Sequence, residues 1–112
     1  MMKMDKFKKG DITVVVPREP LDIDTRKMFK DALIGLIDNG AKAIVVDLSA
    51  VDFVTSTGLS ALLSTAMRME EVSGKFAICS LSQNTLRTFE LAGFLKIMSV
   101  YPSAESAMED LS

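Results

Sequence analysis

The chain has 112 residues, of which 48% are hydrophobic and 25% charged, with one cysteine and no histidine. This length and balance predict one compact domain, residues 1–112, built around a single core. A formal net charge of -2 without a long basic segment argues against nucleic-acid binding. Without histidine and without a cysteine pair, we expect no metal site, no disulfide and no cofactor.

Hydrophobic residues are spread along the chain in short segments. The lysine-rich N-terminus is not followed by the apolar segment that a secretory signal requires. No apolar run has the length of a membrane span. We therefore expect a cytoplasmic protein that does not contact the membrane.

Five of these short segments read as β-strands. Residues 4–8 predict an edge strand, and the β-branched residues 12–16 predict a second strand that pairs with it as a hairpin. Residues 43–48 and 76–79 are apolar almost without alternation, which is typical of strands covered on both faces. Residues 97–101 predict the last strand.

Two longer helices lie between the strands. Asp22 or Asp24 is predicted to cap the first, which runs to about Asn39. The second is predicted to follow the segment that ends at Gly58 and to run to about Ser73.

Two short helices complete the pattern, with Ser82 and Ser103 as their predicted N-caps. Alternation of strands and helices predicts an α/β domain with a mixed, mostly parallel sheet of four to five strands and about four helices. If the strands lie in near-sequential order, right-handed crossovers place the major helices on one face of the sheet.

The second long helix has two different sides. Its predicted core-facing stripe consists of Leu59, Leu62, Leu63, Ala66, Met67 and Met69. Small residues precede Arg68 on the other side, namely Ser60, Ala61, Ser64 and Thr65. This side is either a solvated face or a docking surface, and composition alone does not decide between them.

Three adjacent hydroxyl residues, Thr55, Ser56 and Thr57, stand before Gly58 at the predicted start of this helix. The simplest interpretation is that they are capping residues, which is the more common role. They also suit a phosphorylation switch, in which a kinase adds a charge of about -1.5 to -2 beside the free N–H groups of the first turn.

An enzyme is a third interpretation, in which Ser56 acts as nucleophile with Asp47 or Asp52 as its base. The sequence contains neither a Gly-x-Ser-x-Gly elbow nor a phosphate-binding loop motif. The two aspartates are also conceivable magnesium ligands, but strand termination and turn formation are their more common roles.

The sequence resembles the STAS family, the small domains of bacterial anti-sigma factor antagonists. The resemblance rests on three segments in the expected order: Val46–Leu59 with its Thr-Ser-Thr-Gly-Leu ending, Leu21–Thr25, and Phe89–Ile97. It extends over nearly the whole chain. One position differs, because Thr55 stands where the family has an aspartate.

The resemblance implies a bacterial signalling protein that binds a serine-kinase anti-sigma factor and thereby releases a sigma factor for transcription. It implies phosphorylation at Ser56, with Thr57 and Thr55 as alternatives, and a phosphatase as a second partner. The implied partner-binding residues are Asp22, Thr55, Ser56, Thr57, Gly58, Ser60, Ala61, Ser64, Thr65 and Arg68. Because Thr55 replaces the family's acid, a STAS scaffold that binds partners without switching is an alternative. The oligomeric state is open between a monomer and a weak dimer.

Overall fold

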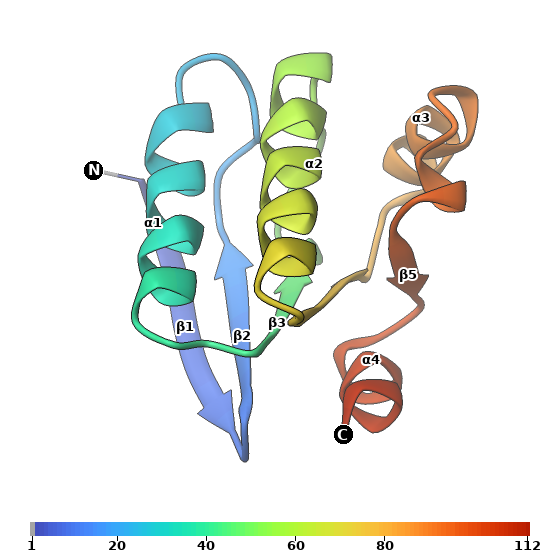
Figure 1. The fold of residues 1–112 in the computed structure, drawn as a ribbon. Coiled ribbons are helices and arrows are strands. Elements are labelled where there is room, and N and C mark those ends of the chain that lie inside the picture. Colours follow the sequence, from blue (N-terminus) through green and yellow to red (C-terminus); the bar gives the residue numbers. More distant parts are fainter. Residues whose placement is uncertain (1) are drawn as a thin grey trace.

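The computed structural model describes residues 2–112, which form one five-stranded sheet, four α-helices and one short 3-10 helix (Figure 1). In chain order the elements are β1 (Met4–Lys9), β2 (Ile12–Pro17), α1 (Arg26–Asp38), β3 (Ala43–Asp47), α2 (Ser56–Glu71), β4 (Lys75–Cys79), α3 (Gln83–Leu91), η1 (Phe94–Lys96), β5 (Ser99–Tyr101) and α4 (Ala104–Leu111). None of the helices formed by residues 2–112 combines the length and the apolar character that crossing a lipid bilayer demands.

The strands lie in the order β1-β2-β3-β4-β5. The β1 strand runs antiparallel to β2 as a hairpin, and the other neighbouring pairs are parallel. The predicted α/β class, the mixed sheet and the hairpin are therefore confirmed.

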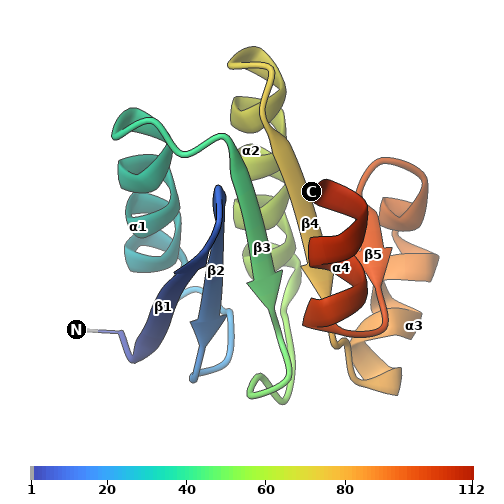
Figure 2. The ribbon, with the colours of Figure 1, turned by 90° about the horizontal axis from the view of Figure 1, so that it is seen from below.

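Alternate residues of the central strands point into two separate cores. Val15, Ile44, Val46 and Ile78 pack with residues of α1, α2 and α3 on one face of the sheet. Residues such as Val14 and Val45 pack on the other face, where Ala107 of α4 joins them. Figure 2 shows α4 on the side of the sheet opposite to α2. The prediction that the major helices share one face is confirmed, with α4 as the helix that covers the other.

Both predicted caps of the short helices are confirmed. The Ser82 side chain accepts a hydrogen bond from the N–H of Thr85, and Ser103 accepts one from Ser106 in a capping box.

The start of α1 differs from the prediction, because its N-cap is Thr25 rather than Asp22 or Asp24. The Asp22 carboxylate accepts hydrogen bonds from the N–H groups of Asp24 and Thr25, at 2.9 and 3.2 Å. Asp22 thus closes the turn that precedes the helix instead of capping it. The structure assigns the aspartate a local role that composition cannot distinguish from a cap.

The last strand is shorter than predicted and begins at Ser99 rather than Ile97. The preceding residues form a 3-10 turn, in which the Phe94 carbonyl accepts hydrogen bonds from the N–H groups of Ile97 and Met98. The Phe94 ring packs edge-on against Phe89, with 6.0 Å between the ring centroids. The hydrogen bonds to the Phe94 carbonyl make residues 94–98 a turn, so the extended segment begins only at Ser99.

Helix α2 begins at Ser56, two residues earlier than Gly58, and its buried side differs from the predicted stripe. Ala61 and Thr65 are 2% and 0% exposed, whereas Met67 is 58% exposed. The Thr65 hydroxyl donates to the Ala61 carbonyl oxygen at 2.9 Å, so it can be buried without an unpaired polar group. Placing Ala61 and Thr65 on the outer side was wrong, as was placing Met67 in the core.

Candidate functional site

The connection from β3 to α2 presents the three hydroxyl residues in different surroundings. Thr55 is the N-cap of α2, and its hydroxyl oxygen accepts a hydrogen bond from the Gly58 N–H at 3.3 Å. The same hydroxyl lies 3.3 Å from the Leu21 carbonyl oxygen, to which it donates. Thr55 is therefore already engaged in holding the start of the helix, as the capping interpretation predicts.

Ser56 is the first residue of α2, and its side chain is exposed. Within residues 2–112 its hydroxyl forms no hydrogen bond, while Thr57 beside it is half-buried. A phosphate on Ser56 would lie beside the N-terminal N–H groups and the positive end of the helix dipole. Among the three hydroxyls, that of Ser56 is the most accessible to a modifying enzyme.

The loop before α1 lies against this helix start, although it is more than thirty residues away in sequence. Leu21 and Val54 form an isolated parallel β-bridge. The Leu21 N–H donates to the Phe53 carbonyl at 3.3 Å, and the Thr55 N–H donates to the Leu21 carbonyl at 2.9 Å. These bonds bring Asp22, which follows Leu21, to the same end of the molecule as Ser56.

Gly58 is buried, which removes it from the predicted contact surface. A Cβ atom at this position would lie 2.3 Å from the carbonyl oxygen of Leu21, a distance that no side chain can occupy. The absence of a side chain allows the Leu21 backbone to pack directly on α2. Gly58 therefore supports the site from behind and does not face a partner.

The accessible side of α2 follows a row with a spacing of four residues. Ser56, Ser60 and Arg68 are exposed in this row, and Ser64 between them is half-buried. Arg68 also pairs with Asp38 of α1, with 3.2 Å between the guanidinium nitrogen and the carboxylate oxygen. Ala61 and Thr65, predicted on the same side, lie in the core and cannot meet a partner in this conformation.

Two exposed apolar residues near this end of the molecule were not predicted from the sequence. Ile23 follows Asp22 and is 74% exposed. Phe53 lies in the connection between β3 and α2 and is 49% exposed. Ile23 lies between Asp22 and Asp24, and that isolation was the available signal, whereas Phe53 stands next to Val54 and carries no such signal. The bond between the Leu21 N–H and the Phe53 carbonyl joins the two loops that carry Ile23 and Phe53. Exposed apolar area gathered in one place, rather than a single exposed residue, is typical of interaction surfaces.

The enzyme interpretation requires Asp47 or Asp52 to act as a base for Ser56, but neither aspartate forms a hydrogen bond with Ser56 in residues 2–112. The Asp47 carboxylate accepts a hydrogen bond from the Ser49 N–H at 2.9 Å and so shapes the turn after β3. Asp52 is exposed. Ser56 lines none of four pockets that residues 2–112 form elsewhere on the molecule. The geometry around Ser56 is that of an open surface.

The cysteine lies at the end of β4 in the core on the α4 side of the sheet. Burial raises the pKa of the Cys79 thiol to about 11. The thiol is thus neutral at physiological pH, and Cys79 is a core residue, as its apolar surroundings in the sequence predict.

Residues 3–107 match the family model of the STAS domain. The chain is 35% identical to a candidate anti-sigma factor antagonist of Bordetella bronchiseptica, over 95% of this chain and 91% of that protein. The crystal structure of a candidate anti-sigma factor antagonist from Thermotoga maritima superposes with a TM-score of 0.93 at 22% identity, covering 96% of this chain and 93% of that one. The Bacillus cell fate determinant SpoIIAA in its phosphorylated form has the same fold, with a TM-score of 0.75 at 18% identity and full coverage of both chains. The sequence match over nearly its whole length shows that this chain belongs to the STAS domain family.

Proposed function

We propose that this protein is an anti-sigma factor antagonist, which binds a serine-kinase anti-sigma factor and is regulated by phosphorylation at Ser56. The observation that carries the proposal is the exposed Ser56 hydroxyl on the first turn of α2, with the Asp22 loop bonded to the same helix start. The name of the Bordetella relative supports the antagonist role. Because the proposed partner kinase uses ATP, the proposed location is the cytoplasm.

The proposed contact area, the α2 docking surface, combines the exposed row of α2 with the two loops beside the start of the helix. It consists of Asp22, Ile23, Phe53, Thr55, Ser56, Thr57, Ser60, Ser64 and Arg68. Ile23 and Phe53 supply exposed apolar area, and the serine row lets a partner backbone approach closely. The proposed role of this surface is binding rather than catalysis, because Ser56 stands on open surface.

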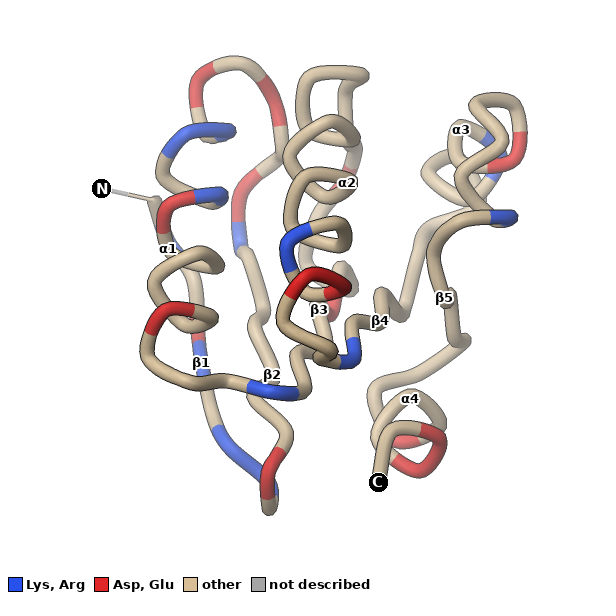
Figure 3. Tube along the Cα trace, in the orientation of Figure 1, with Lys and Arg blue, Asp and Glu red and all other residues tan. Residues whose placement is uncertain are grey.

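Charge explains how phosphorylation would act on binding. Figure 3 shows no charged residue in the first turns of α2, and the first charge along the helix is Arg68. A phosphate on Ser56 would add a charge of about -1.5 to -2 to this uncharged part of the helix. The helix N-terminus would stabilise it by about 0.3–1 kcal/mol, so the fold tolerates the modification. A partner packed on this face would instead have to desolvate the new anion, which is costly.

The test measures the affinity for a serine-kinase anti-sigma factor from the same genome. Ser56→Asp is expected to weaken binding about tenfold or more while the free energy of unfolding changes by about 0.5 kcal/mol or less. Gln83→Asp is the matched control, since it adds one negative charge at the first residue of another helix, α3. Unchanged affinity of Ser56→Asp, or a loss of binding that follows a loss of folding, would contradict the proposal.

A STAS scaffold without switching is the second candidate, and one observation favours it. The position where the resemblance leads us to expect an acid holds Thr55, whose hydroxyl is committed to the helix cap. Such a scaffold would bind its partner equally well with and without ATP. The regulated antagonist would instead lose affinity when kinase and ATP are both present.

A further inference from the structure

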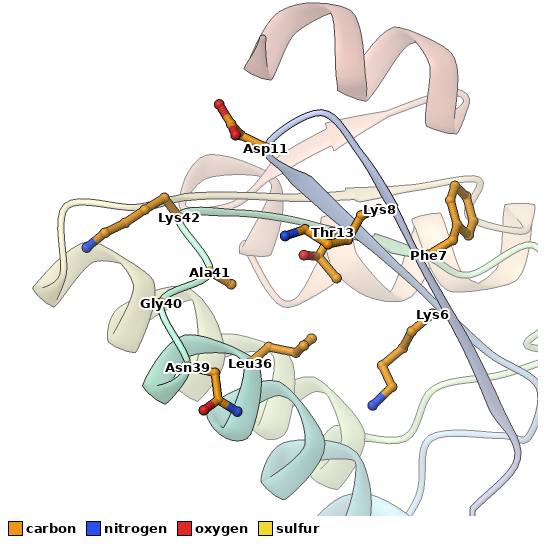
Figure 4. A pocket seen from close by; sticks show the side chains of 10 residues that line it. All are labelled: Lys6, Phe7, Lys8, Asp11, Thr13, Leu36, Asn39, Gly40, Ala41 and Lys42. Atoms are coloured by element: carbon orange, nitrogen blue, oxygen red, sulfur yellow. The ribbon is translucent and has the colours of Figure 1, made fainter.

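A basic pocket of about 510 Å³ lies between the β1–β2 hairpin and the C-terminal end of α1 (Figure 4). Its lining residues are Lys6, Phe7, Lys8, Asp11, Thr13, Leu36, Asn39, Gly40, Ala41 and Lys42. It lies where β2 and β3 begin, whereas the α2 docking surface lies where β3 ends, so the two are at opposite ends of the sheet. The pocket volume lies in the range of small-molecule sites.

Two lysines of β1 point toward the same face of the hairpin. Lys6 and Lys8 are two residues apart on one strand, so their side chains project from the same side. Across the ladder Lys8 stands opposite Thr13, and Lys6 stands opposite Val15. Within residues 2–112 neither lysine forms an ion pair. The hairpin therefore presents two uncommitted positive charges to the pocket.

The net charge of the pocket contrasts with that of the chain. Its lining has three lysines and one aspartate, although the whole chain has a formal charge of -2. Figure 4 shows the Asp11 carboxylate directed away from Thr13. The Lys42 ammonium donates to the Val72 carbonyl oxygen at 3.3 Å, and Figure 4 shows its side chain directed away from Thr13 as well, so Lys6 and Lys8 supply the positive charge that faces the pocket. The lining therefore favours an anion.

Thr13 supplies a hydroxyl within an otherwise apolar strand, Ile12–Pro17. The residue is 6% exposed, and within residues 2–112 its side chain forms no hydrogen bond. Every fully buried side-chain oxygen or nitrogen in that range has a hydrogen-bond partner, so the unpaired Thr13 hydroxyl is not fully buried. Because Thr13 lines the pocket, the hydroxyl is reached from there. A hydroxyl that faces a pocket without a protein partner is free to donate a hydrogen bond to a ligand there.

The end of α1 is compatible with a bound anion. Its last carbonyls would repel a negative charge if they were free. The carbonyls of Gly35, Leu36 and Ile37 instead accept hydrogen bonds from the backbone N–H groups that follow the helix. Leu36 and Ala41 then present apolar surface beside the polar end of the pocket.

We propose that this pocket binds a small organic phosphate. The phosphate lies between the ammonium groups of Lys6 and Lys8 and accepts a hydrogen bond from the Thr13 hydroxyl. The apolar part of the molecule covers Leu36 and Ala41. The common role of lysines on an edge strand is to prevent edge-to-edge aggregation, and that role requires neither the pocket nor a Thr13 hydroxyl that faces it.

The test is a titration of the isotope-labelled protein with phenyl phosphate, followed by the amide signals in NMR spectra at 0.15 M salt. Saturable shifts are expected for residues 6–13 and 39–42, while neutral benzyl alcohol gives none. The double substitution K6Q/K8Q is expected to weaken binding about tenfold or more, and Thr13→Val about threefold, as removal of charge-assisted hydrogen bonds implies.

Lys9→Gln is the matched control, because it removes the same charge from the same strand but outside this lining. Its affinity for phenyl phosphate is expected to stay within about twofold of the unsubstituted protein. Absence of saturable shifts in the pocket, or equal losses in Lys9→Gln and K6Q/K8Q, would overturn the proposal and leave edge protection as the role of these lysines. Binding of the anti-sigma factor is expected to be unchanged in K6Q/K8Q, which separates this inference from the proposed function.

Discussion

The hydroxyls of Thr55 and Ser56 are adjacent, yet the structure uses them differently. Thr55 caps α2 and bonds the Leu21 carbonyl, whereas Ser56 points outward without a hydrogen bond in residues 2–112. A kinase needs a hydroxyl that it can reach without opening the helix. This difference favours Ser56 over Thr55 as the proposed acceptor. The Thr55 side chain instead stabilises the start of α2.

Thr55→Ala is expected to lower the free energy of unfolding by about 1 kcal/mol, because the cap of α2 is lost. Thr55→Ser keeps the hydroxyl and should retain most of that free energy. Urea unfolding of both variants measures the effect. If Thr55→Ala were as stable as Thr55→Ser, the cap would contribute nothing.

Gly58→Ala is expected to lower the free energy of unfolding by about 1–3 kcal/mol, since its Cβ would collide with the Leu21 carbonyl. Gly35→Ala in α1 is the control, because a Cβ there meets nothing within 4 Å. It should stabilise the protein by about 0.5–1 kcal/mol through helix propensity. Denaturant unfolding of the two variants checks these opposite signs, and destabilisation of equal size in both would contradict the packing argument.

Cys79 is expected to resist alkylation in the folded protein. Raising its pKa from 9.0 to about 11 reduces the thiolate fraction at pH 8 about a hundredfold, and burial restricts access further. Iodoacetamide labelling followed by mass spectrometry should show slow modification in buffer and fast modification in concentrated urea. Equal rates in the two conditions would show that the thiol is accessible in the folded state.

At the scale of elements, α2 has one side in the core and one row of small residues outside. The helix packs on the sheet and beside α1 (Figure 1), which widens its buried arc until it includes Ala61 and Thr65. A helical wheel that sorts residues by polarity places Thr65 on the outer side of α2. Thr65 can be buried because its hydroxyl donates to the Ala61 carbonyl one turn earlier. The same wheel misplaces Met67 because hydrophobic character alone does not require burial.

Ala61→Arg is expected to lower the free energy of unfolding by about 3 kcal/mol or more, because it places a charge in the core. Ser60→Arg, one residue earlier on the exposed row, should change it by about 0.5 kcal/mol or less and still weaken binding of the anti-sigma factor. Thermal unfolding and affinity measurements separate the two effects. A stable, folded Ala61→Arg variant would contradict the orientation of α2.

At the scale of the whole molecule, the strands were the most predictable part. Segments such as Val14–Val16 and Ile44–Val46 are buried on both faces, so apolar character is required at every position and the pattern is unambiguous. Contacts between distant segments were not predictable. The Leu21–Val54 bridge depends on Gly58 having no side chain, and nothing local in the sequence states which backbone will pack on that glycine. The sequence therefore located the exposed hydroxyl at the start of α2, while the burial of Gly58, Ala61 and Thr65 became visible only in the structure.

The central claim is that the exposed hydroxyl at the start of α2 receives the regulatory phosphate. The most direct measurement incubates the protein with a serine-kinase anti-sigma factor of the same genome and ATP, and locates the phosphate by mass spectrometry of its peptides. We predict modification at Ser56 and its loss in Ser56→Ala, a variant that keeps Thr55 and Thr57. Phosphate found only at other residues, Thr55 and Thr57 included, would contradict the account.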